Sequence, residues 1–137
     1  MIPSPDFPAE PDRYVLYFNY GCPWAHRTTI VRTLKGLDDL IELVEVDDMD
    51  PGPDKGWFFS GRFGPARDPI TGAKYLRELY LKTDPAFTGR VTVPVLWDKK
   101  TGTLLYAYFT WITCSRKYRH RDVVLPRPWA EELWVKS

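Results

Sequence analysis

Cys22 is the residue whose type and setting best suit covalent chemistry. It follows the turn at Asn19-Tyr20-Gly21 and precedes Pro23, which is typical of a first helical residue. Amide N–H groups and the dipole at a helix start stabilise a thiolate, so we expect a lowered thiol pKa. Position 25 is alanine, so a mixed disulfide at Cys22 must be resolved by an external thiol, for which glutathione is the usual cellular candidate. The alternative is a buried, inert cysteine at a strand–helix junction.

The pair Val93-Pro94 is the second feature that suggests a binding site. It lies inside an apolar run, residues 91–97, where a proline removes one hydrogen-bond donor from a sheet. A cis peptide bond at Pro94 beside a binding site would explain that proline. It would leave the N–H and C=O of Val93 available to an extended, peptide-like ligand. The alternative is an edge strand or a bulge.

A zinc site is the third kind of chemistry to weigh. Cys22 and His26 are four residues apart, and Cys114 and His120 are six apart. Structural zinc sites normally carry two closely spaced ligand pairs, which this arrangement lacks. We therefore expect no metal, and we expect His26 to pack or hydrogen-bond locally.

The elements that must position these residues follow from apolar periodicity and from Gly and Pro positions. We expect strands at 14–18 and 41–46, helices at 23–35 and 73–82, a Gly- and Pro-rich loop between 47 and 72, and a hairpin of 91–97 with 104–108 through the turn 98–102. A right-handed β-α-β unit places helices on its sheet. The order β-α-β-α-β-β therefore predicts an α/β protein with a mixed sheet and a thioredoxin-like fold.

Composition gives no support for a nucleic-acid-binding, membrane-binding or disulfide-rich protein. The 137 residues carry a net charge of +1, which gives no general reason to expect nucleic acid or a membrane surface as a partner. The basic run at 116–121 is isolated and is expected to be solvated rather than bound to RNA. Two cysteines are too few for a disulfide framework. With no signal peptide at the N-terminus, these features predict a cytoplasmic protein.

Four segments together resemble one known family. They are residues 22–27 (CPWAHR), 56–59 (GWFF), 75–80 (YLRELY) and 89–100 (GRVTVPVLWDKK). In this order they closely resemble the glutathionyl-hydroquinone reductases, the Xi class of glutathione transferases, related to the Omega class. The resemblance covers roughly residues 13–103.

The resemblance implies a reaction and a set of site residues. Cys22 would be the catalytic nucleophile that attacks a glutathionyl thioether or mixed disulfide, and a second glutathione would regenerate it. Trp57 would pack against glutathione, and the segment Arg90, Val91, Thr92 and Val93 would hold it. Glutathione, as co-substrate, and glutathionyl conjugates are the partners implied. A second copy of the chain, in a homodimer, is a further candidate partner.

The chain departs from the family after Thr103. The family continues into a glutathione-binding Glu-Ser pair and a helical C-terminal domain, whereas this chain reads Leu104-Leu105-Tyr106 and ends at Ser137. We therefore expect a flexible N-terminus at 1–12, a thioredoxin-like glutathione-binding domain at 13–103, and a divergent aromatic and basic tail at 104–137, with the helical domain missing. The alternative function is a truncated, catalytically inactive fragment that acts at most as a binding module.

Overall fold

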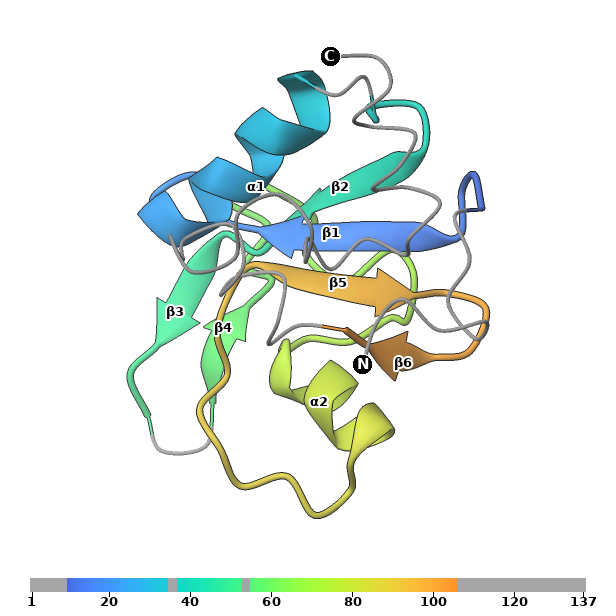
Figure 1. The fold of residues 1–137 in the computed structure, drawn as a ribbon. Coiled ribbons are helices and arrows are strands. Elements are labelled where there is room, and N and C mark those ends of the chain that lie inside the picture. Colours follow the sequence, from blue (N-terminus) through green and yellow to red (C-terminus); the bar gives the residue numbers. More distant parts are fainter. Residues whose placement is uncertain (1–9, 35–36, 53–54, 106–137) are drawn as a thin grey trace, which may run out of the picture.

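A computed structural model of the chain describes residues 10–34, 37–52 and 55–105. Strand β1 (Tyr14–Phe18) lies inside its sheet, and all five of its residues are buried. The sheet has the strand order β2-β1-β5-β6 and includes β2 (Ile41–Glu45), β5 (Val95–Asp98) and β6 (Thr103–Leu104). Strand β1 pairs parallel with β2 and antiparallel with β5 (Figure 1). This is the mixed, thioredoxin-like sheet that the sequence predicts.

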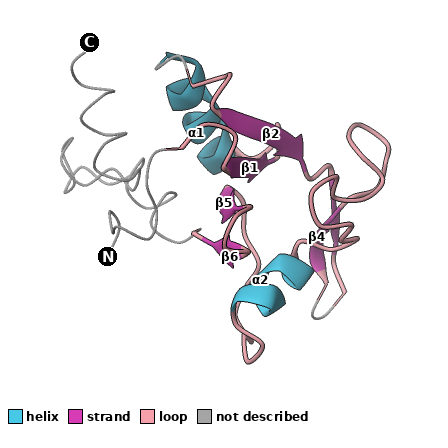
Figure 2. Cartoon of the chain, turned by 90° about the vertical axis from the view of Figure 1, so that its right-hand side faces the viewer, coloured by secondary structure: helices cyan, strands magenta, loops and turns pink. Residues whose placement is uncertain are grey.

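Alternating side chains of β1 enter two separate clusters, because successive residues of a strand point to opposite faces. Val15 and Tyr17 join the larger cluster, which also holds Leu79 and Tyr80 from helix α2 (Arg77–Thr83). Tyr14 and Leu16 join a smaller cluster on the other face. Helix α1 (Pro23–Leu34) and α2 lie on opposite sides of the sheet (Figure 2). The main core therefore lies between the sheet and α2.

The segment after β2 contains regular structure that the sequence did not predict. Instead of a continuous loop from 47 to 72, strands β3 (Asp48–Asp50) and β4 (Gly56–Phe58) form a separate antiparallel pair. Each strand has only three residues, too few to show a periodic pattern. The main sheet and its helices follow the predicted order β-α-β-α-β-β, and this pair is an addition between β2 and α2.

Two predicted element boundaries are also wrong. Helix α2 begins at Arg77 rather than 73, because the amides of Lys74 and Tyr75 donate to the Glu78 carboxylate, each over 2.8 Å. Tyr75 also forms a β-bridge with Phe58. Strand β5 begins at Val95, so the proline at 94 precedes the strand instead of lying inside it, since proline has no N–H for a ladder.

The hairpin between β5 and β6 follows its prediction. Gly102 has a φ of +64°, and its amide donates to the Asp98 carbonyl over 2.9 Å. Strand β6 spans Thr103–Leu104, and the rest of the strand expected at 104–108 lies outside the described residues after Leu105. Neither helix in the described part of the chain has the length or the apolar run needed to cross a bilayer.

Candidate active site

Cys22 lies in the short turn between the end of β1 and the start of α1. Its amide donates to the Asn19 carbonyl over 3.1 Å, and Pro23 is the first residue of α1. Pro23 has no N–H, and the amides of Trp24 and Ala25 have no hydrogen-bond partner among the described residues. These amides give the helix start a local excess of positive potential beside the thiol. The thiol is partly exposed, and it forms no disulfide within the described residues.

Asn19 holds this turn in place, a role that its sequence position alone does not reveal. Its side-chain carbonyl accepts the Gly21 amide over 2.8 Å, and its side-chain amide donates to the Val46 carbonyl over 2.8 Å. The turn is thereby attached to the end of β2. An asparagine ahead of a glycine is a recognisable turn signal, although it does not reveal the bond to Val46.

The thiol of Cys22 faces the main chain of Val93. Its Sγ lies 3.9 Å from the Val93 carbonyl oxygen, and the Val93–Pro94 peptide bond is cis. Within the described part of the chain, the Val93 amide has no hydrogen-bond partner. The fold therefore brings together the cysteine and the Val93-Pro94 segment, the two features that the sequence predicts to be functional, 71 residues apart.

Residues 90–93 alternate between exposed and buried positions. Val91 and Val93 are buried in the main core, whereas Arg90 is exposed and Thr92 is half-buried. No described residue forms an ion pair or hydrogen bond with the Arg90 guanidinium. Arg90 is thus a cation available to an anionic ligand at the edge of this segment.

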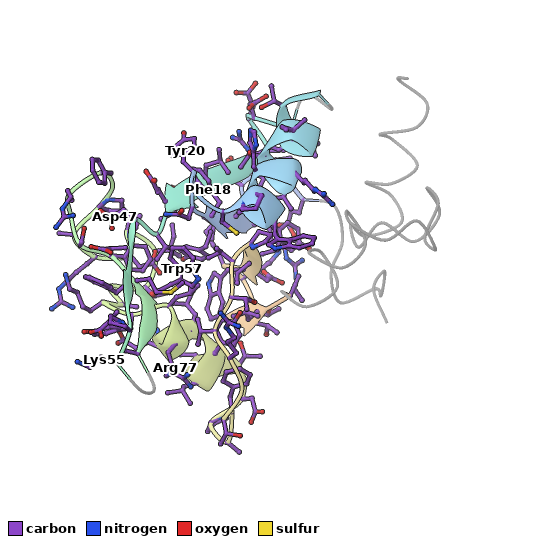
Figure 3. The ribbon with its side chains drawn as sticks, turned by 90° about the vertical axis from the view of Figure 1, so that its left-hand side faces the viewer. Phe18, Tyr20, Asp47, Lys55, Trp57 and Arg77 are labelled. Atoms are coloured by element: carbon purple, nitrogen blue, oxygen red, sulfur yellow. The ribbon has the colours of Figure 1, made fainter. Side chains whose placement is uncertain are left out.

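Trp57 lies on β4 and borders the same region. Its ring is half-buried and packs against the main core, as does Cys22. The preceding residue, Gly56, has a φ of +73°, and a Cβ built there would lie 3.7 Å from the Val91 Cβ. Strand β4 therefore runs beside the 90–93 segment. Figure 3 shows Trp57 between the Phe18 and Tyr20 end of β1 and Arg77 of α2.

Asp47 organises the loop on the other side of the Cys22 turn. Its carboxylate accepts the amides of Ser60, Arg62 and Phe63 over 2.7 to 3.0 Å, and also the Ser60 hydroxyl. Burial raises the pKa of Asp47, but these hydrogen bonds outweigh it and leave the pKa well below its ordinary value. Burial raises the pKa of Glu45, and the nearby negative charge of Asp47 raises it further.

The described residues contain no cluster of three or more His, Cys, Asp or Glu side chains that would suit a metal ion. His26 lies exposed on α1, and its amide donates to the Cys22 carbonyl over 3.0 Å. Cys114 and His120 lie outside the described residues. What the described geometry offers instead is a partly exposed thiol beside an unpaired peptide amide, which suits thiol chemistry on a peptide-like ligand.

Comparison with known proteins identifies the family. A family model described as "Glutathione S-transferase, N-terminal domain" matches residues 21–109, which is more than half of the chain. The chain belongs to the glutathione S-transferase family. This glutathione S-transferase chain is 50% identical over 99 residues to "Glutathione S-transferase omega-like 2" of Schizosaccharomyces pombe, a match that covers 72% of the chain and 31% of the relative.

The other similarities agree with the resemblance to the Xi class. "Glutathionyl-hydroquinone reductase YqjG" of Escherichia coli is 48% identical over 100 residues, with 72% of this chain and 30% of the relative covered. The glutathione-bound structure of YqjG superposes with a TM-score of 0.68 at 41% identity, covering 83% of this chain and 36% of that one. The Xi-class transferase of Phanerochaete chrysosporium gives 0.69 at 39% identity, covering 94% and 41%.

These comparisons confirm the predicted family and the thioredoxin-like fold of this glutathione S-transferase chain. The chain spans about a third of the length of these curated relatives.

Proposed function

We propose that this chain carries out glutathione-dependent thiol–disulfide exchange of the glutathionyl-hydroquinone reductase type, with Cys22 as the nucleophile. The observation that carries the proposal is the position of the Cys22 Sγ, 3.9 Å from the Val93 carbonyl and beside a Val93 amide that has no hydrogen-bond partner among the described residues. An extended peptide that pairs with the Val93 main chain would bring its own sulfur towards that thiol.

The chemistry balances with glutathione as the only reductant. The Cys22 thiolate attacks the sulfur of a glutathionyl-hydroquinone, the bond between that sulfur and the ring breaks, and the ring carbon takes up a proton. The product is a Cys22–glutathione mixed disulfide and a free hydroquinone. A second glutathione thiolate then attacks the glutathione sulfur of the mixed disulfide, which releases glutathione disulfide and the Cys22 thiolate. Overall, one glutathione thiol and the thioether sulfur are oxidised to a disulfide, and the ring carbon is reduced by two electrons.

The remaining site residues bind the tripeptide. Val93 pairs with the cysteinyl portion, and Val91 and Thr92 hold the backbone segment in an extended form. Arg90 supplies positive charge for a carboxylate, and Trp57 covers apolar surface of the ligand. Residues 13–103 form the glutathione-binding unit in this proposal, and a reducing compartment such as the cytoplasm keeps Cys22 active.

Intact-mass spectrometry of the purified chain after brief exposure to glutathione disulfide at neutral pH tests the proposal. We expect one rapid glutathione adduct, which is lost in Cys22→Ser and kept in the matched variant Cys114→Ser. Equal labelling of both cysteines, or no adduct at all, would contradict the proposal. The second result would favour an inactive fragment that acts at most as a binding module.

A further inference from the structure

The segment 75–80 (YLRELY) contacts both parts of the proposed glutathione site. At its N-terminal end, the Leu76 amide donates to the Trp57 carbonyl over 2.9 Å, and Tyr75 forms a β-bridge with Phe58. These bonds attach the start of α2 to β4. The position of Trp57 therefore depends on this segment.

At its C-terminal end, the segment holds the peptide that leads to Val93. The Tyr80 hydroxyl donates to the Thr92 carbonyl over 2.9 Å and accepts the Thr92 amide over 3.2 Å. Tyr80 is 1% exposed, and its ring packs against Phe87 with the centroids 4.8 Å apart. One buried hydroxyl thus satisfies both main-chain groups of the residue immediately before Val93.

Arg77 holds the beginning of the same peptide less firmly. Its Nη2 donates to the Gly89 carbonyl over 3.3 Å, and its guanidinium lies 5.9 Å from the centre of the Phe87 ring. The stronger restraint is therefore the two-way bond from Tyr80 to Thr92.

We infer that Tyr80 is a positioning residue for glutathione, because its hydroxyl fixes the Thr92 main chain and so aims the Val93 amide at the ligand. The inference rests on the proposed function, since it assigns a role within the same site. Tyr80 makes no contact with the reacting sulfur atoms in this scheme. It acts through the backbone that the ligand pairs with.

The Tyr80→Phe variant removes the hydroxyl and keeps the buried ring. Without the hydroxyl, the Thr92 amide and carbonyl lose their shared partner, and the backbone of residues 91–93 becomes more flexible. Glutathione must then order this backbone when it binds, which lowers its affinity. We expect the half-saturating concentration of glutathione disulfide in the Cys22 reaction to rise about fivefold. Reaction of Cys22 with iodoacetamide, which needs no main-chain pairing, should keep its rate.

Tyr17→Phe is the matched control. It also removes a buried tyrosine hydroxyl, which donates to Asp68 over 2.8 Å, but Asp68 binds the loop at 70–71 rather than the 91–93 segment. We expect this variant to lose stability without any change in the half-saturating concentration. Thermal unfolding of each variant of the 137-residue chain checks that it is folded at the assay temperature.

The possible results distinguish the positioning role of Tyr80 from the proposed reaction of Cys22. An unchanged half-saturating concentration in Tyr80→Phe, with a reactive wild-type chain, would overturn the positioning role alone. An equal rise in Tyr17→Phe, or an equally slowed reaction with iodoacetamide, would also overturn it, because general loosening would then be the cause. No adduct with the wild-type chain would overturn the proposed function and, with it, a ligand-positioning role for Tyr80.

Discussion

At the scale of single residues, Arg90 differs from most charged groups near the site. The guanidinium is exposed and has no partner among the described residues, whereas the half-buried Arg77 bonds to the Gly89 carbonyl. An unpaired cation contributes little to folding but is attracted to a carboxylate of the ligand. Arg90 therefore suits binding better than stability.

The Arg90→Ala variant separates these two contributions. We expect its free energy of unfolding to change by less than about 0.5 kcal/mol. The half-saturating concentration of glutathione disulfide should rise roughly three- to tenfold, and added salt should weaken binding to the wild-type chain more than to the variant. Kinetics of adduct formation at two ionic strengths measure both effects. Lys82→Ala removes another exposed cation and serves as the control, and an equal rise there would contradict a specific role for Arg90.

At the scale of elements, Asp47 joins the end of β2 to the loop at residues 60–63. Its depressed pKa means that the folded state favours the carboxylate, so the stabilisation is present above the unfolded pKa of about 3.9 and is lost as the pH falls below it. We expect Asp47→Asn to lower the free energy of unfolding by about 2 kcal/mol at pH 7. Urea denaturation between pH 7 and pH 3 should show this difference shrinking towards low pH.

An exposed acid provides the control for this pH dependence. Asp39 lies exposed in the turn before β2, and its side chain has no hydrogen-bond partner among the described residues. We expect Asp39→Asn to follow the wild-type curve. A constant difference between Asp47→Asn and the wild-type chain at every pH would show that the carboxylate charge is not what stabilises the loop.

Some of the helices and strands could be predicted from the sequence, and others could not. The strand at Tyr14–Phe18 and the helix start at Pro23 were predictable because five apolar residues and one proline carry those signals locally. Strands β3 and β4 were not, because three-residue strands have no measurable period. The roles of Asn19 and Tyr80 depend on which distant backbone groups lack partners, and only the folded chain reveals them.

At the scale of the whole molecule, a buried ion pair joins the residue just before β1 to the β5–β6 hairpin. The Arg13 guanidinium donates to both Asp98 carboxylate oxygens, over 3.0 and 2.7 Å, across 85 residues of sequence. Asp98 is fully buried and also accepts the amides of Lys100 and Thr101. Burial opposes its charge, but the bonds from Arg13 and from the turn keep the pKa of Asp98 below its usual value.

Removing one partner of this pair should therefore affect the whole fold. Asp98→Ala leaves the Arg13 charge buried without its main partner and the turn without its acceptor, and we expect a loss of about 3–5 kcal/mol in the free energy of unfolding. That is comparable with the total stability of many small domains. Glu42→Ala removes an exposed pair with Lys99, 3.4 Å apart, and should cost less than about 1 kcal/mol. Urea denaturation of the three chains measures both values, and equal losses would show that burial does not set the strength of the Arg13–Asp98 link.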